Sequence, residues 1–144
     1  MKPYSKQQPG EYPSLSLVEL KQWGGIKYRL SKGNGMLQAF WGNKWHTKQH
    51  PSVQVLEYRD AMRELINTRI PQSEEVLLHA YGYLHNTDWQ EGEEFDIFRG
   101  PKFADAIAEA RLYTARAKRA FGECLRANTH KKNGNNALDI LQRL

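Results

Sequence analysis

Apolar and polar residues alternate strictly over residues 26–31, and this pattern constrains the fold more than any other feature of the chain. A period of two residues predicts a half-buried β-strand, and its outward face here is basic. The Gly-Asn-Gly turn signal at 33–35 follows, and the six residues after it predict the second strand of a hairpin. With a second turn at 42–43 and a third strand, the sequence predicts a three-stranded antiparallel meander over about residues 26–48.

Three or four helices are expected after the meander, which makes the predicted fold class α+β. Apolar residues at three- and four-residue spacing predict a helix over about 52–70, and a serine cap predicts a second one over about 73–86. Proline is tolerated in a first helical turn, so Pro101 marks the start of the longest helix, over about 102–127. A short helix over about 14–23 is also expected before the meander.

The chain is predicted to contain one domain with two appendages. Residues 1–14 hold three prolines and read as an irregular arm, residues 15–130 form a single α+β domain, and residues 131–144 form a hinge and a short C-terminal helix. An apolar helix of that length must dock on its own domain or on a second copy. Together with Leu112, which falls on the polar face of the predicted long helix, it indicates a possible homodimer.

Charge is segregated along the chain although the net value is only +5. Residues 1–50 hold eight Lys/Arg and two acids, residues 51–101 hold four and ten, and residues 102–144 hold nine and four. Two basic blocks therefore bracket an acidic one. Such blocks either create local fields that attract a charged ligand or neutralise each other in the folded domain.

Cysteine usage and hydropathy restrict the class of protein. Cys124 is the one cysteine, so an internal disulfide and the usual structural zinc sets are excluded. No apolar run approaches the length of a membrane span, and residues 1–13 contain no apolar signal-peptide core. We therefore expect a cytoplasmic protein with no membrane partner.

Catalytic patterns are weak, so we expect no enzyme, no catalytic residues, no metal and no cofactor. His46 and His50 have the spacing of two ligands on a helix, but they fall in a predicted strand and turn. The acids of residues 88–96, followed by Lys102, resemble metal-dependent nucleases in composition. A metal site needs carboxylates that converge from separate elements, whereas these lie in one loop.

Basic and aromatic residues gather in three regions that suit a nucleic acid. Lysine holds phosphates, arginine bridges base edges, and aromatic rings stack on bases. The regions are the first meander strand, the hairpin after it, and the basic face of the predicted long helix. The candidate nucleic-acid-binding residues are Lys27, Arg29, Lys44, Trp45, His46, Lys48, Arg111, Arg116, Lys118, Arg119 and Arg126.

No known family motif is matched residue by residue, but two layouts resemble DNA-binding folds. A three-stranded meander followed by an amphipathic helix, over about residues 26–68, is similar to the sheet-reading domains of plant AP2 factors and phage integrase arm-binding modules. A strand over residues 52–58 followed by two helices would instead be similar to a ribbon-helix-helix protomer. Both resemblances imply binding in the major groove, and neither assigns a role to a particular residue.

These observations favour a DNA-binding protein of the small regulatory or accessory kind found in bacteria, plasmids or phages, with a role such as transcription regulation. RNA is a second candidate ligand, because aromatic rings beside lysines also suit unpaired bases. The alternative is a protein-binding inhibitor or adaptor that uses the acidic loop at 87–96 and its aromatic surface.

Overall fold

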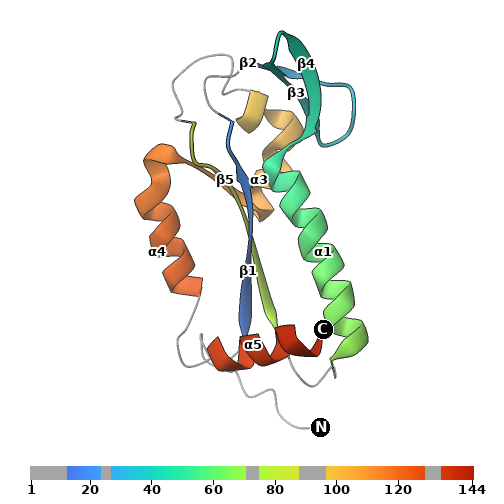
Figure 1. Cartoon of the computed structure of the whole chain (residues 1–144), viewed down its shortest axis with the longest axis vertical. Coiled ribbons are helices and arrows are strands. Elements are labelled where there is room, and N and C mark those ends of the chain that lie inside the picture. The colour runs from blue at the N-terminus through green and yellow to red at the C-terminus, as the bar shows by residue number, and fades with distance from the viewer. Residues whose placement is uncertain (1–12, 24–26, 71–74, 88–96, 129–133) are drawn as a thin grey trace.

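The computed structural model of the chain describes residues 13–23, 27–70, 75–87, 97–128 and 134–144. They form two separate sheets (Figure 1). One is a parallel sheet in the order β1-β5-β6, built from β1 (Ser14–Lys21), β5 (Leu77–Leu84) and β6 (Arg111–Thr114). The other is antiparallel and consists of β2 (Lys27–Leu30), β3 (Met36–Trp41) and β4 (Lys44–Gln49).

The antiparallel sheet confirms the predicted meander. Gly35, Gly42 and Asn43 have backbone φ angles of 71°, 58° and 62°, the left-handed region that tight turns require and that glycine and asparagine tolerate best. Tyr28 and Ala39 pair across the sheet and are buried on its inner side. The turn residues and the alternation of the strands therefore determine this part of the fold locally.

The parallel sheet contradicts the helices expected over 14–23 and 73–86. Every second residue of β1 points to one face, so Leu15 and Leu17 lie against the same helix, α1 (Pro51–Arg69). Strand β5 is covered on both faces, and its apolar residues therefore show no clean alternation. A buried strand of that kind cannot be distinguished from a helix by periodicity alone.

Helix α1 confirms the helix predicted after the meander and excludes the strand that a ribbon-helix-helix protomer would need at 52–58. It lies along one face of the parallel sheet, with the meander at its N-terminal end (Figure 1). Val55 packs there against Ala80, and Ile66 packs against Val76. This face holds most of the apolar contact between helix and sheet.

The prediction of one long helix at 102–127 is wrong. The segment instead forms a 3₁₀ turn (Pro101–Phe103), α3 (Ala104–Glu109), β6, a second 3₁₀ turn (Ala115–Ala117) and α4 (Lys118–Asn128). Leu112, expected on a polar helix face, is only 9% exposed and belongs to the main core. Pairing of residues 111–114 with β5 overrides the helical propensity of the surrounding alanines.

Helix α4 lies on the opposite side of the parallel sheet from α1 (Figure 1). Its Phe121 packs against Tyr81 and Tyr113 of the sheet. Helix α5 (Gly134–Arg143) docks on the same chain, because Ile140 is 1% exposed in a cluster with Ile66 and Ile70. Among the described residues, no helix has the length and apolar character needed to cross a membrane.

Gly82 in β5 marks the closest approach between the sheet and the start of α1. A Cβ atom at this position would lie 2.8 Å from Leu112 Cδ1 and 3.2 Å from Pro51 Cβ. The Leu112 methyl group and the Pro51 ring therefore occupy the space of a side chain, and only glycine allows this contact without a shift.

The substitution Gly82→Ala is expected to lower the free energy of unfolding by about 1–3 kcal/mol, the usual cost of overpacking a core. Gly122→Ala is the matched control, because a Cβ there meets nothing within 4 Å in the middle of α4. That change should stabilise the protein by about 0.5–1 kcal/mol through helix propensity. Urea denaturation of both variants measures the difference, and equal midpoints would contradict the close packing at Gly82.

Candidate functional site

The solvent side of the meander gathers basic and aromatic residues from all three strands. Antiparallel partners point to the same side of a sheet. The pairing places Lys27 beside Phe40 and Phe40 beside Trp45, while Arg29 pairs with Gln38. We call this side the outer face, and its residues are Lys27, Arg29, Gln38, Phe40, Trp45 and Thr47.

Arg29 is held in place on the outer face by two neighbouring strands. Its Nε donates a hydrogen bond to Gln38 Oε1 at 2.6 Å, and Gln38 Nε2 donates in turn to Thr47 Oγ1 at 3.3 Å. The guanidinium carbon lies 4.1 Å from the centre of the Trp45 ring, a cation–π distance. None of these contacts uses the two terminal nitrogens of the guanidinium, which are the pair that binds a phosphate or a guanine edge.

Two aromatic rings of the outer face lie outside the hydrophobic cores of the described residues. The Phe40 and Trp45 rings are 5.2 Å apart and inclined at 58°. Both are half-buried, and neither belongs to a core cluster in the part of the chain that the structure describes. Within the described ranges, Trp45 thus contacts Phe40 and Arg29 on a side of the sheet that faces away from the core.

The remaining meander candidates lie on the other side of the sheet. Lys44, His46 and Lys48 alternate with Trp45 along β4, so they point away from the outer face. The His46 ring stacks on Trp41 at 3.7 Å, and the Lys48 ammonium lies 5.5 Å from the same ring. The structure thus separates Trp45 from the two lysines with which the sequence had grouped it.

The basic residues after position 110 are not on the outer face either. Arg111 lies on β6 beside Tyr113, Arg116 lies in the second 3₁₀ turn, and Lys118, Arg119 and Arg126 lie on α4. Figure 1 places α4 across the parallel sheet from α1, away from the meander. Among the described residues, these five therefore do not join Lys27 and Arg29, although Lys102 of the second basic block donates to the carbonyls of Ser31 and Met36 beside the meander.

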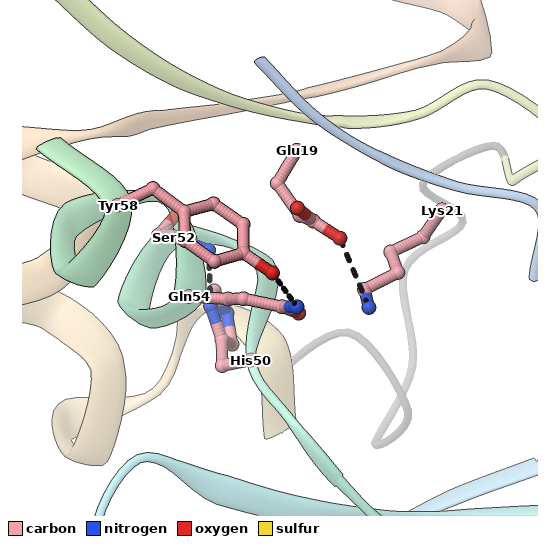
Figure 2. Close-up of polar contacts among 6 residues, drawn as sticks. All are labelled: Glu19, Lys21, His50, Ser52, Gln54 and Tyr58. Carbon is pink, nitrogen blue, oxygen red and sulfur yellow. Dashed lines mark hydrogen bonds and ion pairs between the residues drawn. The ribbon is translucent and has the colours of Figure 1, made fainter. Parts of the chain in front are cut away.

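A second polar group lies at the C-terminal end of β1 and was missed by sequence reasoning. Glu19 Oε1 and Lys21 Nζ form an ion pair at 3.1 Å, with side chains only 15% and 18% exposed. On the facing turn of α1, Gln54 Nε2 donates to Tyr58 Oη at 2.7 Å. Figure 2 shows the polar ends of these four residues, which we call the β1-end group, directed toward one another.

The β1-end group was hidden by the incorrect helix at 14–23. In a helix, two residues two positions apart point about 200° apart, whereas in a strand they point to the same side. Glu19 and Lys21 continue the inward-facing row of Leu15 and Leu17. A strand reading of this stretch would have revealed a carboxylate and an amine in a row that is otherwise apolar.

His50 and Ser52 have a structural role, because their hydrogen bonds hold the start of α1 in place. His50 is fully buried; its Nδ1 accepts a hydrogen bond from the Ser52 amide, and its Nε2 donates to the Phe98 carbonyl at 3.0 Å. Burial lowers the pKa of His50 to about 4, so the ring is neutral at pH 7. Ser52 Oγ donates to the Ala110 carbonyl at 2.7 Å, which ties α1 to the segment before β6.

Among the residues that the structure describes, no three His, Cys, Asp or Glu side chains gather to hold a metal ion by themselves. The acids of residues 88–96, which carry the alternative of a protein-binding loop, lie outside the described residues. Comparison of the chain with protein-family models, with curated proteins and with solved structures found no match.

Stability is expected to fall between pH 7 and pH 5 because of His50. The unfolded histidine titrates near 6.5 and the folded one near 4, so the unfolded state binds more protons in this interval. The contribution, about 3 kcal/mol, is fully present above pH 6.5 and is lost as the pH falls toward 4. Urea unfolding at pH 7 and pH 5 measures the part of this loss that falls in the interval, about 2 kcal/mol.

The variant His50→Asn separates this effect from other titrations. Asparagine can still cap the helix but does not titrate in this range. It should be less stable than the original chain at pH 7 and show a smaller loss between pH 7 and pH 5. An unchanged pH dependence in the variant would contradict the role given to His50.

Proposed function

We propose that the protein binds nucleic acid through the outer face of the meander. The observation that carries the proposal is Arg29, whose guanidinium is fixed by Gln38 and by Trp45 while its terminal nitrogens are not used in those contacts. A fixed guanidinium loses less side-chain entropy on binding than a free one. Such a residue suits a bidentate phosphate or base contact.

The charge of the meander supports an anionic ligand. No carboxylate occurs between Glu19 and Glu57, whereas this stretch contains six lysines and arginines. Lys27 and Arg29 lie on the outer face, and none of the described residues of this face is acidic. A nucleic acid offers both the negative charge and the flat bases that this combination of residues accepts.

This proposal retains the expectation of a cytoplasmic DNA-binding regulator or accessory factor, but it moves the principal contacts. The sequence suggested that the hairpin and a basic C-terminal helix grip the ligand together. The outer face instead offers one compact set of contacts on three strands, and α4 lies elsewhere. The basic residues of α4 then contribute at most a second, independent contact.

The double variant Lys27→Ala/Arg29→Ala should weaken binding to a random DNA duplex and reduce its salt dependence. Each lost phosphate contact lowers the slope of log K against log salt by about 0.9, so the slope should fall by up to about 1.8. Fluorescence anisotropy at several salt concentrations measures both quantities.

Lys118→Ala/Arg119→Ala is the charge-matched control, because it removes the same two charges from α4. It should change the affinity and the slope much less than the meander variant. If the two variants weaken binding equally, the interface includes α4 or the attraction depends only on net charge. If the protein does not bind DNA at low salt, the proposal is wrong.

A second candidate function, hydrolysis of a phosphodiester, is favoured by the β1-end group. A half-buried ion pair adds little to stability, because desolvation offsets the attraction of the charges. The inward-facing row of β1 is otherwise apolar, so packing alone does not account for Glu19 and Lys21. Polar groups at the C-terminal ends of parallel strands are a common location of ligand sites.

The four side chains supply suitable chemistry. Mg²⁺ is commonly held by one or two carboxylates together with the phosphates of the substrate, so Glu19 can serve as its protein ligand. The Lys21 ammonium and the Tyr58 hydroxyl can stabilise charge on phosphate oxygens. Water then adds to phosphorus as one P–O ester bond breaks, which leaves a phosphate monoester and a hydroxyl.

The β1-end group and the outer face are joined by short connections. Five residues separate Lys21 from Lys27, so their Cα atoms are at most about 22 Å apart. The other end of the meander runs directly into α1, which carries Gln54 and Tyr58. A nucleic-acid strand several nucleotides long is therefore long enough to reach from the outer face to Glu19 and Lys21.

Cleavage of labelled DNA is expected with Mg²⁺ and not with excess EDTA. Glu19→Gln should lower the rate roughly 100-fold or more, because it removes the carboxylate that holds the ion. Glu57→Gln, an exposed acid of α1, is the matched control and should keep the full rate. Cleavage that survives in Glu19→Gln, or no cleavage at all, contradicts the second function and leaves the binding proposal intact.

A further inference from the structure

We infer that the outer face is built for unpaired nucleotides, with at least one base stacked on the Phe40–Trp45 pair. The inference rests on the proposed binding function and names the class of nucleic acid. It starts from the two rings, which lie on the solvent side of the sheet and outside the cores of the described residues. Large aromatic rings in that position are removed from solvent only when a planar group stacks on them.

The position of the rings excludes ordinary contact with paired bases. In a duplex the flat faces of the bases are stacked on one another, and only their edges are open in the grooves. Rings that stand on a sheet can reach the face of a base only when that base is unstacked. Phe40 and Trp45 lie side by side on β3 and β4, so they offer neighbouring surfaces to successive bases.

The charged residues of the outer face complete the site. Arg29 lies over the Trp45 ring, and Lys27 pairs with Phe40 across the sheet, so each ring has a cation beside it. The phosphate that follows a stacked base can then reach a terminal nitrogen of Arg29 or the ammonium of Lys27. Gln38 and Thr47 hold Arg29 in this position before any ligand arrives.

The test compares a short oligodeoxythymidylate and an oligouridylate with a DNA duplex at one salt concentration. Electrostatic attraction alone favours the duplex, which carries one charge per roughly 1.7 Å of its axis. Tighter binding of either single strand therefore reports base contacts. A preference between the two single strands reports the sugar together with the thymine methyl group, and both results support the inference.

The variant Trp45→Ala should weaken single-strand binding by roughly tenfold, within the range measured for base–aromatic stacking, and weaken duplex binding less, because Gln38 still holds Arg29. Trp45→Phe should recover most of the affinity, because it restores a ring. Lys27→Ala is the contrasting variant and should weaken single strand and duplex to a similar extent. Thermal unfolding of each variant checks that the fold is retained.

The failures of the two proposals are distinguishable. If neither single strand nor duplex binds at low salt, nucleic-acid binding itself is wrong. If the duplex binds as tightly as the single strands, and Trp45→Ala leaves single-strand affinity unchanged, the stacking site is wrong while the binding function stands.

Discussion

The buried junction at the start of α1 is the contact on which the rest of the structure depends. His50 caps the helix and bonds to Phe98, Ser52 bonds to Ala110, and Pro51 rests against the backbone of Gly82. One short segment thus joins the end of the meander to the parallel sheet and to the chain on either side of α3. Because these groups are buried and hydrogen-bonded, each bond is costly to lose. The orientation of the meander relative to the sheet, and hence of the outer face relative to the β1-end group, follows from this junction.

Sequence patterns were reliable where structure is determined locally. The meander depends on turns at 33–35 and 42–43 and on alternation within a few residues, and α1 depends on spacing within one segment. The parallel strands were misread because their partners are far away in the sequence. Strand β5 is apolar on both faces, and β6 lies between short helical segments rich in alanine. Only pairing with a distant strand distinguishes these segments from helices, and a single sequence does not display that pairing.

The candidate site shows the same division. Lys27, Arg29 and Trp45 were found by residue type, and correct strand positions place them on one face. Lys44 and Lys48 were grouped with Trp45 by proximity in sequence, although the period of a strand puts them on the opposite side. Glu19 and Lys21 were overlooked for the converse reason. Side chains two positions apart point to different sides of a helix but to the same side of a strand. In both cases the periodicity assigned to the backbone determined which side chains were grouped.

The pairing of β1 with β5 also has a consequence for how the chain folds. Ser14 pairs with Leu77, so the first strand and its partner are separated by 63 positions. At ordinary rates of synthesis, β1 leaves the ribosome roughly 3 to 12 seconds before β5. The backbone hydrogen bonds within the meander and within α1 are local and can form during that interval, whereas the apolar residues of β1 remain unpaired until β5 is available. Long-range pairing of this kind slows folding and leaves strand edges exposed in the meantime. The nascent chain is therefore most prone to aggregation in the period before residue 84 emerges.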